Sequence, residues 1–170
     1  MRYALGALMA LATALLAYSV LPSVRPLGVQ PDLALLLAVC WAVAWSPGEG
    51  LLLAIVAGTL SDLLGTRPVG LSALGALPAL ALAALGQATV VQASLPTALV
   101  AVGLGTLAQH ILHLMVYTIT GEGPSWGDAL LRGALPAALV NALWTPLVLV
   151  LLWGLRALLG PRMAGPRLGE

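Results

Sequence analysis

Residues 31–70 read PDLALLLAVCWAVAWSPGEGLLLAIVAGTLSDLLGTRPVG, two apolar runs joined by a short SPGEG turn, and each run carries one aspartate. Asp32 lies at the expected start of the first helix, where a carboxylate can accept backbone N–H bonds and meets the positive end of the helix dipole. Asp62 lies near the end of the second run. The turn after it contains Gly65, Arg67 and Gly70. An acid at the centre of a bilayer costs roughly 2.5–3.5 kcal/mol, so we expect each aspartate to have a partner or a depth that spares it.

The composition around this stretch excludes a soluble protein. Of the 170 residues, 61% are hydrophobic and only 8% are charged, whereas a soluble domain carries about 25% charged residues. The apolar runs show no alternation of apolar and polar residues, which favours helices over a transmembrane barrel. The net charge of +1 leaves no basic stripe for nucleic acid. The sequence therefore predicts an all-α membrane protein.

Proline and glycine divide the chain into six expected transmembrane spans within one membrane domain, residues 1–170. The expected spans are residues 3–21, 32–46, 51–64, 69–91, 95–119 and 135–159. The second and third are short, because about 20 helical residues are needed to cross roughly 30 Å of hydrocarbon. A thinned bilayer, partners that cover the helix ends, or a re-entrant hairpin that lowers the span count to four would each accommodate them.

The arginines give a weak orientation signal. With an even number of spans, four of them lie on one side of the membrane, namely Arg2, Arg156, Arg162 and Arg167. The other three lie on the opposite side, beside an acidic loop expected at 121–132, namely Arg25, Arg67 and Arg132. This bias predicts that both termini are cytoplasmic.

Small residues recur at four-residue spacing in the first and third spans. Gly6, Ala10 and Ala14 form one stripe, and Ala54 and Gly58 form another that continues to Asp62. Such stripes let another helix approach closely. For Asp62 two interpretations stay open: a helix-end acid paired with Arg67 or backbone N–H groups, or a polar contact to another helix or a ligand.

The fifth and sixth spans carry the remaining polar candidates. Gln109 and His113 share a helix face, and His110 lies one turn from His113. Asn141 lies in the last span. We expect interhelical hydrogen bonding from these residues, with ligand or proton handling by the histidines as the alternative. Two histidines without a nearby cysteine or carboxylate complete no zinc site, so the sequence predicts no metal and no cofactor. It also lacks a catalytic constellation, which predicts a protein that is not an enzyme.

Three motifs resemble a known family. They are Pro31-Asp32-Leu33 before an apolar run, the segment from Gly58 through Asp62-Leu63-Leu64-Gly65 to the run Pro68–Leu74, and Asn141 followed by Pro146. In these motifs, and in length and span number, the chain resembles the rod shape-determining protein MreD family of bacteria. It departs from the family in its scarcity of aromatic residues and in Glu49, where a basic residue is common.

The resemblance implies a subunit of the bacterial inner membrane with a fold similar to the six-helix substrate-binding subunit of energy-coupling-factor transporters. It implies a non-enzymatic scaffold of the cell-wall elongation machinery, which supports peptidoglycan synthesis. The expected partner is an MreC-like bitopic protein, with MreB, RodA and a penicillin-binding transpeptidase in the same assembly. The transmembrane helix of the MreC-like protein is expected to dock in a groove of this chain, formed by the small-residue stripes and polar groups. The partner-binding or interhelical candidates are Asp32, Gly58, Asp62, Gly65, Arg67, Gly70, Gln109, His113 and Asn141.

The alternative function is a substrate-binding subunit of a vitamin transporter. In that case Asp62, Arg67 and the 121–132 loop would hold a small molecule near the outer surface.

Overall fold

The computed structural model describes residues 2–19, 21–23, 25–65, 68–88, 94–121 and 123–159, and these residues contain helices and no strand. The long helices are α1 (Arg2–Ser19), α2 (Leu33–Ala44), α3 (Pro47–Leu64), α4 (Leu71–Ala88), α5 (Leu95–Ile119) and α7 (Leu135–Leu159). Two short 3-10 helices, η1 (Leu21–Ser23) and η2 (Pro26–Gly28), precede α2. The short α6 (Trp126–Asp128) and the π-helical η3 (Ala129–Ala134) lead into α7.

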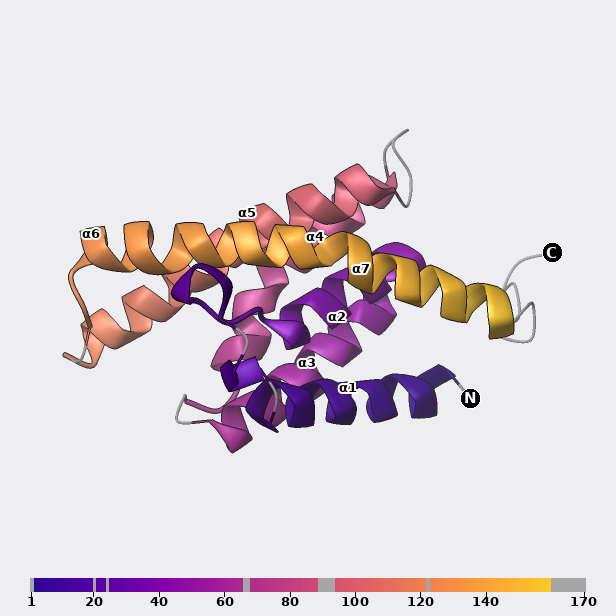
Figure 1. Ribbon diagram of the computed structural model, residues 1–170, viewed down its shortest axis with the longest axis horizontal. Coiled ribbons are helices and arrows are strands. Elements are labelled where there is room, and N and C mark those ends of the chain that lie inside the picture. The colour runs from indigo at the N-terminus through magenta and orange to yellow at the C-terminus, as the bar shows by residue number, and fades with distance from the viewer. Residues whose placement is uncertain are drawn as a thin grey trace.

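Length and composition confirm the prediction of an all-α membrane protein. Four helical stretches are long and apolar enough to cross a membrane: Pro47–Leu64, Leu71–Ala88, Leu95–Ile119 and the continuous stretch Trp126–Leu158. The apolar stretches Ala4–Ser19 and Leu33–Ala44 are shorter. The start of α1 and the end of α7 lie at the same end of the helix bundle (Figure 1).

Helix α2 forms the centre of the bundle. Residues 34–44 are all buried, and α1, α3, α4, α5 and α7 all contact this helix (Figure 1). Its sequence, LALLLAVCWAVA, is apolar on every side, which is typical of a helix enclosed by others. At a rise of 1.5 Å per residue, twelve residues cover about 18 Å, which is less than the hydrocarbon thickness.

Side chains from other helices cover the C-terminal end of α2. Gln87 Nε2 donates to the carbonyl oxygens of Ala42 and Val43, and Arg156 donates to that of Ala44. These carbonyls have no partner within the helix, and a bilayer offers no water to bind them. The structure thus shows the C-terminal end of this short helix covered by side chains of the same chain.

Helix α3 begins four residues earlier than expected, so the prediction that this span is short was wrong. Ser46 caps the helix by accepting a hydrogen bond from the backbone nitrogen of Glu49, and Pro47 occupies the first helical position. A serine cap followed by proline is a strong helix start. The SPGEG segment is therefore mostly the first turn of an 18-residue helix.

The prediction of an acidic loop at 121–132 was also wrong, because the chain is helical from residue 126 onward. Ser125 accepts a hydrogen bond from the backbone nitrogen of Asp128 and starts α6 at Trp126. The chain then continues through η3 into α7 without a break. Arg132 lies 3.4 Å from the carboxylate of Asp128 on the exposed face of this segment.

Candidate functional site

A polar network lies at the N-terminal end of α2. The Asp32 carboxylate accepts hydrogen bonds from the backbone nitrogen of Leu35 at 3.0 Å and from Gln109 Nε2 at 2.9 Å. Asn141 Oδ1 accepts from the backbone nitrogen of Asp32 at 2.8 Å, and Asn141 Nδ2 donates to Thr106 Oγ1 at 3.1 Å. Gln109, Asn141 and Thr106 are buried. The network therefore joins the start of α2 to α5 and α7 through buried polar side chains.

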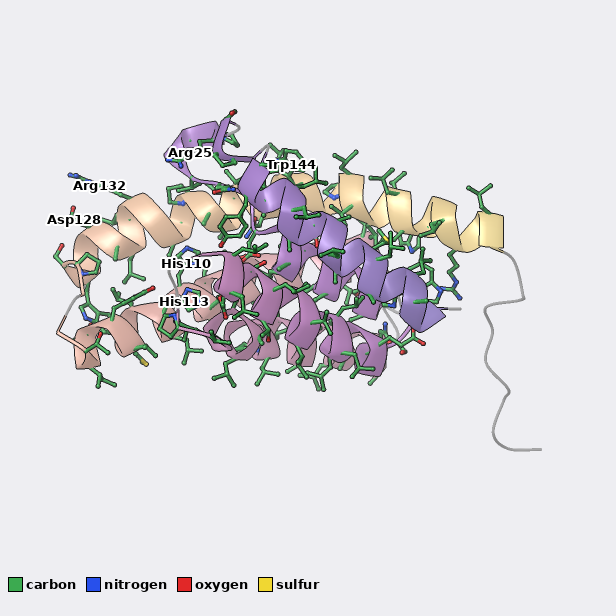
Figure 2. The ribbon with its side chains drawn as sticks, turned by 90° about the horizontal axis from the view of Figure 1, so that it is seen from below. Arg25, His110, His113, Asp128, Arg132 and Trp144 are labelled. Carbon is green, nitrogen blue, oxygen red and sulfur yellow. The ribbon has the colours of Figure 1, made fainter. Side chains whose placement is uncertain are left out.

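A cavity of about 200 Å³ adjoins this network. It is lined by residues of the segment before α2, of α5, of η3 and of α7: Val29, Gln30, Asp32, Gln109, His110, His113, Gly133, Ala137 and Asn141. Figure 2 shows His110 and His113 between α5 and the segment that leads into α7, with Asp128 and Arg132 farther out along that segment. Gly133 belongs to the π-helical turn, a feature that often occurs at functional sites.

Two histidines of α5, His110 and His113, line the cavity. His110 Nδ1 lies 2.9 Å from the backbone oxygen of Thr106, one turn earlier in α5. Because a carbonyl oxygen only accepts, Nδ1 carries the proton in this contact, and Nε2 of the neutral ring is an acceptor. The ring centres of His110 and His113 are 6.4 Å apart. Within the described ranges, no three His, Cys, Asp or Glu side chains are grouped to hold a metal ion.

Asp62 and Gly58 lie apart from this network, at the contact between α3 and the start of α4. Both carboxylate oxygens of Asp62 accept hydrogen bonds from Ser72, one from its backbone nitrogen at 3.0 Å and one from its hydroxyl. A Cβ added to Gly58 would lie 2.8 Å from the backbone nitrogen of Ala73. The stripe of the third span is therefore filled by α4 of the same chain, and Asp62 binds a backbone N–H group on a neighbouring helix.

The turn between α3 and α4 contains two more of the expected residues. Gly65 lies against the hydroxyl of Tyr18, which donates to the backbone oxygen of Ser61 at 2.6 Å. Gly70 has φ +89°, a left-handed conformation that glycine adopts without strain. Arg67 lies outside the described residues.

The structure thus brings Asp32, Gln109, His113 and Asn141 together and places Gly58, Asp62, Gly65 and Gly70 elsewhere. Sequence reasoning missed Thr106, whose hydroxyl links Asn141 to the backbone oxygen of Val102. Its position one turn before His110 was the available signal, since side chains four residues apart share a helix face.

A largely apolar groove lies where α1, α2 and α3 meet. It has a volume of about 200 Å³ and is lined by Gly6, Ala7, Trp41, Glu49, Leu52, Leu53 and Val56, which come from α1, α2 and α3. We call it the α1–α3 groove. Gly6 approaches Leu53 closely, since an added Cβ would lie 3.2 Å from Leu53 Cδ2. Ala7, Leu52 and Val56 are exposed along it.

Comparison with known protein families gives a match over most of the chain. The family model for the rod shape-determining protein MreD matches residues 1–158. Neither the curated proteins nor the solved structures contain a match, so the similarity to transporter substrate-binding subunits stays a prediction. The match covers every transmembrane stretch described above. The chain therefore belongs to the MreD family of rod shape-determining proteins and has a role in determining rod shape.

Proposed function

We propose that this chain is a non-enzymatic scaffold of the bacterial inner membrane, with both termini in the cytoplasm. It binds the single transmembrane helix of an MreC-like protein and thereby supports peptidoglycan synthesis during elongation. MreB, RodA and a penicillin-binding transpeptidase belong to the same assembly. The family match supports the role in cell shape, and the α1–α3 groove is the observation that carries the binding mode.

The lining of the groove supports this binding mode. Its exposed lining combines the small residue Ala7 with Leu52 and Val56, which are 51% and 41% exposed, whereas Gly6 is buried against Leu53. In a bilayer, small residues favour helix association because the two backbones can approach closely. The two predicted small-residue stripes are themselves filled within the chain: Gly58 packs against α4, and Gly6, Ala10 and Ala14 are buried.

The experiment is co-purification from the native host, with partners identified by mass spectrometry. The variant Ala7→Trp fills the groove, and we expect it to lower recovery of the MreC-like partner about tenfold, which corresponds to about 1.4 kcal/mol of binding free energy. The matched control is Ala81→Trp, because Ala81 is also an exposed alanine on a membrane-spanning helix.

The control is expected to recover the partner at the wild-type level. Equal recovery by both variants would remove the groove from the binding site. Recovery of paired ATPases and a coupling subunit in place of an MreC-like protein would favour the transporter alternative over the scaffold.

A further inference from the structure

We infer that the cavity at the N-terminal end of α2 binds a primary ammonium group, held by Asp32 and His110. This inference is independent of partner binding, because the cavity and the α1–α3 groove share no lining residue.

The negative charge of Asp32 favours a cation in the cavity. Asp32 is the one carboxylate among the residues that line the cavity. Among the described residues, no basic side chain forms an ion pair with Asp32 within 4.0 Å. The carboxylate is instead held by Leu35 N and Gln109 Nε2, both neutral donors. A cation in the cavity would supply the opposite charge to a carboxylate that is half-buried and has only neutral donors.

The cavity wall also offers several hydrogen-bond acceptors that an N–H donor could use. A carboxylate has about four acceptor sites, and the two described donors use two of those of Asp32. His110 adds the acceptor Nε2, because its Nδ1 is engaged with the backbone oxygen of Thr106. Gln109 Oε1 is a further buried acceptor in the wall and has no donor among the described residues. An ammonium group carries three N–H donors and no acceptor, which matches this set.

The volume of the cavity and the atoms in its wall limit which cation can bind. A volume of about 200 Å³ equals roughly six or seven waters at about 30 Å³ each, so a group of a few heavy atoms fits. Hard metal cations prefer sites made of oxygen ligands, whereas this wall contributes imidazole nitrogen. An N–H donor can use both the carboxylate and the imidazole.

Two sources can present such a group: a free small amine or the ethanolamine headgroup of a lipid. A second cavity, of about 330 Å³, shares Gln30 and Asp32 with the first and is also lined by Arg25 and Tyr18. Arg25 offers a cation to the phosphate that an ethanolamine headgroup carries beside its ammonium. The experiment therefore has one arm for each source.

In the first arm, thermal unfolding of the purified full chain in detergent is followed with ethanolamine hydrochloride as the probe. Tetramethylammonium chloride at the same ionic strength is the comparison, because it has the charge and no N–H donor. At a probe concentration about one hundred times Kd, we expect ethanolamine to raise Tm by roughly 5 °C. In the second arm, the chain is placed in nanodiscs with and without phosphatidylethanolamine.

The test variant is Asp32→Asn, which retains a good helix cap because asparagine and aspartate cap equally well. The control is Asp128→Asn, which removes an exposed carboxylate outside the cavity. We expect the shift to persist in the control and to vanish in Asp32→Asn. If Asp32→Asn does not fold, His110→Phe replaces it and is expected to lose at least half of the shift.

An Asp32-dependent shift with ethanolamine assigns the free amine, and one confined to nanodiscs with phosphatidylethanolamine assigns the headgroup. The inference is overturned if neither probe gives an Asp32-dependent shift. It is equally overturned if tetramethylammonium produces the same shift as ethanolamine.

Discussion

Replacing Gly105 with alanine is expected to lower the Tm of the purified protein by roughly 3–10 °C. The added Cβ would lie 2.2 Å from Ala79 Cβ and 2.7 Å from Ala79 Cα. A contact with backbone cannot be relieved by a side-chain rotation, so α4 and α5 must separate. The measurement is thermal unfolding in detergent, monitored by tryptophan fluorescence.

Gly103 provides the matched control, because it lies two residues away in α5 and an added Cβ would meet nothing within 4 Å. Gly103→Ala is expected to keep or slightly raise Tm, since alanine is favoured over glycine in a helix by up to about 1 kcal/mol. An equal loss in both variants would show that close packing at Gly105 is not what holds α4 against α5.

Replacing Asp62 with alanine is the second large effect. The substitution removes both acceptors of Ser72 and leaves its backbone nitrogen without a partner at the start of α4. Losing a hydrogen bond to a buried charged group costs about 1.5–3 kcal/mol, so Tm is expected to fall by roughly 3–10 °C. Unfolding of the variant in the same detergent measures this loss.

Asp128→Ala is the control for Asp62→Ala. The Asp128 side chain is 63% exposed and pairs with Arg132 at the surface, and exposed pairs contribute about 0–1 kcal/mol. Its loss of Tm is expected to be less than half that of Asp62→Ala. A larger effect at Asp128 would contradict the assignment of Asp62 as the residue that anchors α4 to α3.

The apolar runs predicted the main helices because long unbroken runs leave the backbone no alternative in a bilayer. The helix starts at Pro47 and Trp126 were missed, since Ser46 and Ser125 were read as turn residues although each has the spacing of a cap. In α6 and η3, the Ser125 cap starts a helix that continues through Asp128 and Arg132, the charged residues that had suggested a loop.

The candidate site was only partly predictable. Asp32 was identified as a helix start, and Asn141 as an interhelical residue, from local pattern alone. Their hydrogen bond joins residues 109 positions apart, and no local pattern fixes such a contact. The same holds for Gly58, where the spacing indicated close packing and the structure alone shows that the neighbour is α4.

We propose that this MreD-family chain acts in rod shape determination by binding a partner helix in the α1–α3 groove. The most direct test is cell shape after depletion of the native protein, with each variant supplied at the wild-type level in the membrane. The account predicts that Ala81→Trp restores rods while Ala7→Trp leaves rounded cells. Rods restored by Ala7→Trp would contradict it.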